Sequence, residues 1–209
     1  MRRLFPLVLV LSGCMNAYVA RYDIGLIEVE RPANALERYG EAEIVRSDSA
    51  GVVNYMFSDS LISVLWIPGG EQLNFVLQNK SSHSIKIVWD EAAFVHPSGL
   101  SSRVMHSGVR YIERNAPQPP SVVARGGSIV DLVVPTDNVY YVEGRYGGWR
   151  THGLFQPHRA SSSAKLATAK ENIGKKAQVL LPIEIEGIVN EYTFSFEVQD
   201  VEIVGPRGR

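Results

Sequence analysis

The sequence predicts an all-β fold, an antiparallel β-sandwich with one or two short helices and long loops. Two observations carry this prediction. Short runs of the chain alternate apolar and polar residues at period two, and clusters of Gly, Pro, Asn and Ser separate those runs. Hydrophobic residues make up 45% of the chain, which is ordinary for a globular domain.

Three apolar runs in the first half of the chain are predicted to be strands. Leu61–Ile67 ends at a Pro-Gly-Gly turn, and the runs at 73–78 and 85–90 alternate on either side of a polar turn at 79–84. We expect the second and third runs to pair as a hairpin whose buried face includes Trp89.

The second half of the chain holds the most regular strand pattern. Residues 179–186 and 192–199 alternate strictly around a turn at 187–190. Pro182 lies inside the first of these runs and has no N–H to donate, which predicts an edge strand or a bulge. Shorter strands are expected at 94–95, 103–105, 122–123 and 129–134.

The chain divides into four predicted parts: a signal peptide at 1–13, a tether at 14–22, an N-terminal extension at 23–58 and the β-sandwich domain at 59–209. The extension combines a strand pattern with a short helix pattern that ends at Gly40, and we expect it to pack on the main domain. A second short helix is predicted over Ser163–Ile173, just before Gly174.

The runs Phe75–Asn79 and Ile85–Trp89, with their turn, resemble the central hairpin of immunoglobulin-like domains in bacterial envelope proteins. The resemblance covers about a fifth of the chain and lacks the two cysteines that join the sheets of antibody domains. It therefore implies an immunoglobulin-like architecture and no particular function.

The N-terminus has the layout of a secretory signal. Arg2 and Arg3 precede an apolar run from Leu4 to Leu11, which is too short to span a bilayer. The tetrapeptide Leu11-Ser12-Gly13-Cys14 resembles the lipobox of bacterial lipoproteins. This resemblance implies cleavage before Cys14, the only cysteine, and attachment of a diacylglycerol and an N-acyl chain such as palmitate.

Such an anchor predicts a location in the cell envelope. Stable anchoring needs more than one acyl chain, which lipoprotein modification supplies. Met15 is not the aspartate that retains enterobacterial lipoproteins in the inner membrane, so the resemblance implies the outer membrane, facing the periplasm or the cell surface. The alternative is a secreted protein with a cysteine near its cleavage site by chance.

No motif for catalysis or metal binding is complete in the sequence. Glu184 and Glu186 share one face of a predicted strand, where a solvated strand surface is favoured over an acid–base pair. His152 and His158 are the only histidines close together, and no zinc-ligand spacing includes them. The sequence has no Gly-x-Ser-x-Gly motif, and its formal net charge of −1 argues against nucleic acid as a partner. We therefore expect no catalytic residue, no metal and no cofactor.

Two long segments, Ser101–Pro120 and Thr136–Arg159, are candidates for binding. The second is rich in Tyr, Trp and Arg, the residue types that dominate recognition hot spots. An alternative is that these side chains fold back and cap one end of the sandwich. The residues we single out as the candidate binding loop are Tyr146, Trp149, Arg150, His152 and Phe155.

The expected function is that of a lipid-anchored, non-catalytic binding or assembly module, with an envelope protein as its partner. A peptidoglycan- or glycan-contacting lipoprotein is the alternative, which exposure of both Tyr146 and Trp149 would favour. A periplasmic hydrolase is a third, which His106 or His152 beside a carboxylate and a serine in one cleft would favour. The sequence leaves the partner's identity and the oligomeric state open.

Overall fold

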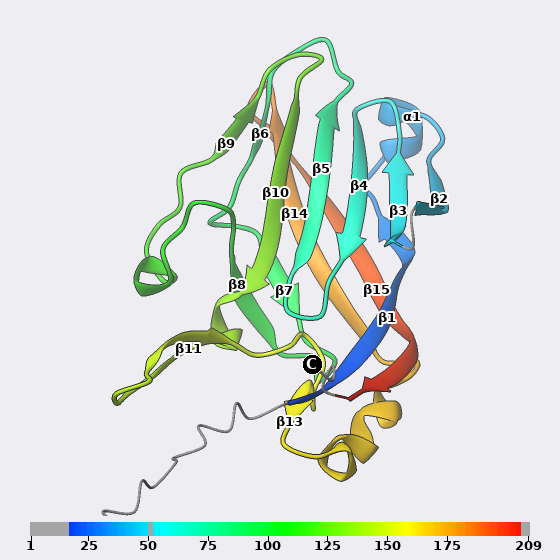
Figure 1. The fold of residues 1–209 in the computed structure, drawn as a ribbon. Coiled ribbons are helices and arrows are strands. Elements are labelled where there is room, and N and C mark those ends of the chain that lie inside the picture. Colours follow the sequence, from blue (N-terminus) through cyan, green and yellow to red (C-terminus); the bar gives the residue numbers. More distant parts are fainter. Residues whose placement is uncertain (1–16, 50–51, 206–209) are drawn as a thin grey trace, which may run out of the picture.

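The computed structural model describes residues 17–49 and 52–205, so the predicted signal peptide and Cys14 lie outside the described residues. Two antiparallel layers face each other (Figure 1). The first sheet follows the order β2–β3–β4–β5–β10. Its strands are β2 (Glu43–Ser49), β3 (Val52–Ser58), β4 (Ile62–Pro68), β5 (Leu73–Asn79) and β10 (Ser128–Pro135).

The second sheet is built around β14 and β15, with β1 and β13 beyond β15 and with β6, β9, β7 and β8 on the other side of β14. Its strands are β1 (Tyr18–Glu30), β6 (Ile85–Ile87), β7 (Ala93–Val95), β8 (Ser101–Met105), β9 (Ser121–Val123), β13 (Arg159–Ala160), β14 (Lys176–Ile185) and β15 (Ile188–Val204). The end of β8 pairs with the end of β10, which joins the two layers.

Short helices and one separate hairpin complete the fold. The hairpin is β11 (Val139–Val142) with β12 (Gly148–Thr151). The helices are α1 (Ala35–Tyr39) and the 3₁₀ segments η1 (Tyr111–Glu113), η2 (Thr136–Asn138) and η3 (Ser163–Asn172). The prediction of an all-β sandwich with few short helices is confirmed.

The core lies between the two sheets and is rich in aromatic side chains. Trp66 on β4 is fully buried, and its ring centroid lies 5.1 Å from that of Phe194 and 5.2 Å from that of Phe196, both on β15. Phe57 on β3 contacts Phe194 edge-on at 5.7 Å. These contacts cross the sandwich, so they hold one layer against the other.

The predicted hairpin of 73–78 with 85–90 is wrong, although both runs are extended and apolar on one face. β5 pairs with β4 and β10, whereas β6 pairs with β14 and β9. The turn at 79–84 therefore carries the chain from one sheet to the other, as between strands B and C of an immunoglobulin domain. Asn79 holds this crossing, since its Nδ2 donates to the carbonyls of His83 and Val123.

The predicted tether and extension need correction, because residues 18–58 supply strands to both sheets. β1 begins at Tyr18 and pairs with β15 along most of its length. Ala20, Tyr22, Ile24 and Leu26 are all buried and alternate with polar residues or glycine. The period-two pattern therefore begins within the predicted tether. Its buried positions there are Ala20, which is small, and Tyr22, which is amphipathic.

Pro182 lies in an interior strand rather than at an edge. β14 pairs with β7 through residues 178–180 and with β6 through residues 183–185, and Pro182 lies between these two stretches. Its missing N–H therefore coincides with the place where β14 changes neighbours, and its carbonyl accepts a hydrogen bond from Val88. The following turn is tighter than predicted, with Glu186 and Gly187 at positive φ.

Candidate binding surface

The two long segments singled out in the sequence meet beside the β11–β12 hairpin. The Tyr111 ring of η1 lies 6.1 Å from the Trp149 ring of β12. The guanidinium of Arg114 lies 5.1 Å from the Trp149 ring centroid, within cation–π range. The Thr151 hydroxyl donates to the Tyr111 hydroxyl at 3.4 Å. Residues about 40 positions apart thus form one surface.

The hairpin presents its aromatic rings by strand pairing. Tyr141 on β11 lies directly opposite Trp149 on β12, and their rings meet edge-on at 5.4 Å. Trp149 is half-buried because it also packs on the small apolar cluster of Met105, Val134 and Val139. Trp149 therefore fixes the hairpin to the sandwich, whereas Tyr141 remains exposed.

A hollow of about 370 Å³ lies beside these rings. Aromatic side chains and two arginines line it, and a single carboxylate, Glu71, lies at its side. We define the aromatic–arginine surface as the aromatic and arginine side chains in and around this hollow: Tyr111, Arg114, Tyr140, Tyr141, Trp149, Arg150 and Arg159.

Charge in the hollow is only partly neutralised within the chain. Glu71 Oε1 lies 3.0 Å from Arg159 Nη2 and 3.4 Å from His158 Nε2. Arg150 donates only to the backbone carbonyl of Tyr146, at 3.1 Å, and no carboxylate pairs with it among the described residues. An exposed cation beside aromatic faces suits a ligand that carries both a negative group and a flat or apolar face.

The structure places the five predicted loop residues in four different surroundings. Trp149 and Arg150 line the hollow. Tyr146 is 82% exposed at the hairpin tip, and His152 stacks on Tyr140 with 4.1 Å between ring centroids. The prediction that Phe155 belongs to the binding loop needs correction. Its side chain is 2% exposed and lies in the main core, where its ring centroid is 5.6 Å from that of Tyr22.

Two residues of the surface and one carboxylate beside it were not predicted, because they lie far from residue 149 in the sequence. Tyr111 and Arg114 come from the other long segment, and Glu71 from the turn between β4 and β5. The sequence marked Ser101–Pro120 as a long loop but held no sign that it approaches residue 149. The pairing of β8 with β10 brings the two segments to the same end of the sandwich.

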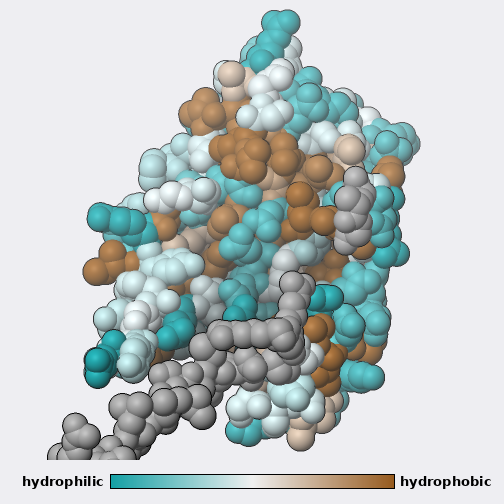
Figure 2. Space-filling model, in the orientation of Figure 1, coloured by the Kyte–Doolittle hydropathy of each residue, from teal (hydrophilic) through white to brown (hydrophobic). Residues whose placement is uncertain are grey.

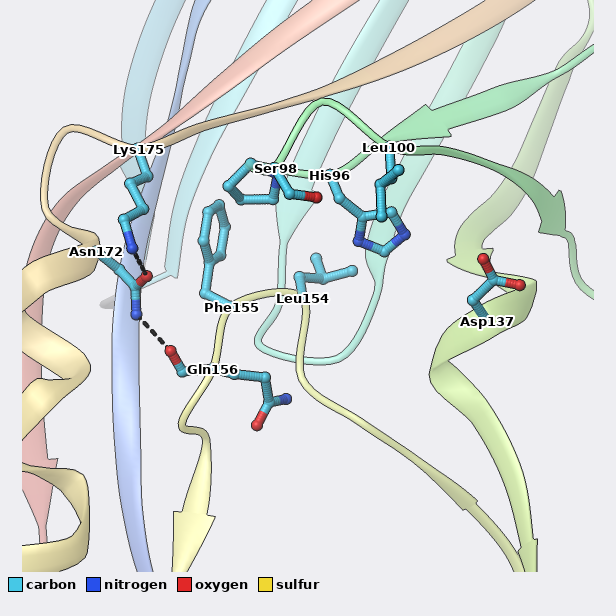
Figure 3. Close-up of a pocket in the computed structure, with 10 residues that line it drawn as sticks. His96, Ser98, Leu100, Asp137, Leu154, Phe155, Gln156, Asn172 and Lys175 are labelled. Carbon is cyan, nitrogen blue, oxygen red and sulfur yellow. Dashed lines mark hydrogen bonds between the residues drawn. The ribbon is translucent and has the colours of Figure 1, made fainter.

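A larger hollow between η3 and the β7–β8 turn is lined largely by side chains that hold the fold together (Figure 3). Asn172 donates to the Gln156 carbonyl at 2.7 Å and accepts from Lys175 at 3.0 Å, as the dashed lines in Figure 3 show. His96 lies at its edge, 3.1 Å from the Ser102 hydroxyl, and burial lowers the pKa of His96. Asn172, Gln156 and Lys175 are therefore already hydrogen-bonded within the fold.

The neighbours of His106 and His152 bear on whether the chain could be a hydrolase. His106 Nδ1 lies 3.2 Å from Asp131 Oδ2, and its ring stacks flat on Trp89 at 4.3 Å. Asp131 Oδ1 accepts the backbone N–H groups of Ser107 and Leu132. Within the described part of the chain, no serine hydroxyl hydrogen-bonds His106 or His152, so the geometry that would favour a hydrolase is not assembled at either.

Comparisons with family models, curated proteins and solved structures found no match to this chain. Over residues 17–49 and 52–205, no three His, Cys, Asp or Glu side chains gather as a metal site would require. Nor does any helix in that part of the chain have the length and apolarity needed to cross a membrane.

His158 should make the stability of the fold depend on pH. Burial lowers the pKa of His158, and the neighbouring Glu71 carboxylate opposes part of that shift. The unfolded chain therefore binds a proton that the folded chain does not, once the pH falls below about 6.5. The contribution of His158 to stability is complete above that pH and decreases below it.

We expect the free energy of unfolding in urea to fall between pH 7 and pH 5, and to fall less in His158→Gln. His96 is unchanged in the variant, so it adds the same slope to both proteins. Equal slopes for wild type and variant would contradict the assignment to His158.

Proposed function

We propose that this chain is a lipid-anchored protein of the bacterial cell envelope, held by Cys14, that acts as a non-catalytic binding or assembly module. The observation that carries the binding part is the convergence of Tyr111, Arg114 and Trp149 from two distant segments. A chain that needed these loops only to cap the sandwich would bury them, whereas Tyr111 and Tyr141 are 38% and 58% exposed.

The composition of the aromatic–arginine surface favours a protein partner. Tyr, Trp and Arg carry most of the binding energy in protein interfaces, because they combine a large apolar area with a polar end. The Trp149 ring contacts the side chains of Tyr111, Tyr141 and Arg114. Since the ring is already ordered, a partner would lose little entropy in fixing it.

The proposal is tested by crosslinking and pulldown from intact cells with wild type and Arg150→Ala. Arg150 is exposed and bonded only to a backbone carbonyl, so its loss should leave the fold unchanged. We expect capture of one envelope protein to fall by about tenfold or more, as for a hot-spot residue. Lys165→Ala, an exposed change on η3, is the matched control and should capture as much as wild type.

Equal capture by wild type and Arg150→Ala would contradict the assignment of the surface. Trp149→Ala should lose the partner as well, and its circular dichroism spectrum shows whether the hairpin is still folded.

Glycan binding is the second candidate, and one observation favours it. Tyr146 is 82% exposed, and the guanidinium of Arg145 lies 5.7 Å from its ring centroid. An exposed aromatic face can stack on a sugar, and the neighbouring arginine can pair with a carboxylate of peptidoglycan. The half-buried Trp149 fits this candidate less well. Binding of soluble peptidoglycan fragments that is lost in Tyr146→Ala would favour it over a protein partner.

A further inference from the structure

The edge strand β2 is left open along its whole length. Among the described residues its only neighbour is β3, and the register between them runs without a bulge from Glu43 to Ser49. All side chains from Glu43 to Asp48 are exposed. An open edge strand presents a row of unpaired N–H and C=O groups that can pair with another strand.

Several other strands with an open edge in the described chain are short or irregular, although β10 is also open from Ser128 to Val133, beyond its pairing with β8. β9 and β13 have only three and two residues. β1 is long, but its pairing with β15 shifts register twice, which bends the strand. β2 has seven residues, no proline and no register shift. It therefore lacks several of the devices by which natural sheets avoid edge-to-edge contact.

The outer face of the first sheet adds an apolar row that ends at this edge. Val45, Met56, Leu65, Val76 and Val130 are successive cross-strand partners from β2 to β10. Val45, Met56 and Val130 are 47%, 43% and 75% exposed. Figure 2 views this face and shows hydrophobic side chains gathered over its upper part. The row gives the β2 edge an apolar side as well as free backbone groups.

The charges on β2 are complementary to those of a second copy. When two β2 strands pair antiparallel with Ser47 opposite Ser47, Arg46 of each copy lies opposite Asp48 of the other. This gives two opposite-charge cross-strand pairs. A register centred on Arg46 would place two arginines opposite each other, which brings like charges together.

We propose that two copies of this chain associate through β2, antiparallel and centred on Ser47, so that their first sheets form one continuous sheet. The contact is isologous, because the same strand is used on both sides of a two-fold axis. Arg46 and Asp48 have no ion-pair partner among the described residues of one copy, so both are free to pair across the axis. This inference does not depend on the proposed anchor or on the aromatic–arginine surface.

Charge reversal tests both the partner and the register. Arg46→Asp gives a β2 strand with acidic residues at both positions, and Asp48→Arg gives one with basic residues at both. Each variant should repel itself, whereas a mixture of the two restores both opposite-charge pairs. The substitutions are on exposed side chains, and circular dichroism checks that the fold is retained.

The measurement is sedimentation equilibrium of the chain carrying Cys14→Ser, so that a shared detergent micelle cannot mimic association. We expect a dimer at concentrations of about 50 µM, at least a tenfold weaker association for each single variant, and recovery in the equimolar mixture. Arg125→Asp, in an exposed turn, is the control and should dimerise as the parent does.

Three results would overturn the proposal. The parent chain could remain monomeric, which would leave the edge to another protein. Both single variants could dimerise as well as the parent, which would place the interface elsewhere. The mixture could fail to recover the dimer, which would exclude this register.

Discussion

Trp66→Ala should lower the free energy of unfolding by about 3–5 kcal/mol, the usual cost of removing a fully buried tryptophan. Trp66 is 0% exposed, and its ring contacts Phe75 in its own sheet and Phe194 and Phe196 in the facing sheet. Removing the ring leaves a cavity between the layers that neighbouring aromatic rings cannot fill without leaving their own contacts. Domains are stable by only about 5–15 kcal/mol, so this loss is a large fraction of the total.

The matched variant is Trp66→Phe, which keeps a ring in the cavity. Among the described residues the indole N–H of Trp66 has no hydrogen-bond partner. Phenylalanine removes that unpaired donor, which offsets part of the lost volume, so we expect a loss of less than about 2 kcal/mol. Urea denaturation of the two variants and wild type measures the difference. Equal losses for Ala and Phe would contradict this account of the core.

Cys14→Ser should move the protein from the membrane fraction to the soluble fraction while leaving the sandwich folded. Each buried CH2 of an acyl chain contributes about 0.8 kcal/mol to membrane binding, so the lipidated and unlipidated proteins should partition very differently. The measurement is fractionation of a Gram-negative host, with an intact mass of the purified protein to detect the acyl groups.

Met15→Ser is the control for this prediction, because it changes the next residue and leaves the cysteine. It should stay in the membrane fraction with the acyl groups attached. Recovery of Cys14→Ser in the membrane fraction, with its signal peptide removed, would contradict the proposed anchor.

The sequence predicted individual strands better than it predicted their partners. Alternation along residues 73–78, 85–90 and 192–199 indicates which face each strand buries, and Leu77, Ile87 and Phe194 are indeed buried. Alternation does not state which strand lies alongside. β5 and β6 were therefore assigned to one hairpin, although their neighbours come from residues 128–135 and 176–185.

The candidate site was predictable only in part, for a related reason. Residues 136–159 are rich in aromatic residues and arginines, and this content predicts a binding role for Trp149 and Arg150 from residue type alone. Phe155 has the same signal but belongs to the core, packed on Tyr22. Tyr111 joins Trp149 through the tertiary fold, and no local pattern in the sequence reports a contact of that kind.

The central claim is that the aromatic–arginine surface binds a partner in the cell envelope. The most direct measurement places a photocrosslinking phenylalanine analogue at Tyr141 in living cells, and separately at Lys165 on η3 as a control. Both side chains are exposed, but only Tyr141 belongs to the aromatic–arginine surface, and the analogue keeps its aromatic ring. We predict one discrete crosslinked protein from position 141 and none from position 165. The same products from both positions, or none from position 141 while the protein is in the membrane fraction, would contradict the claim.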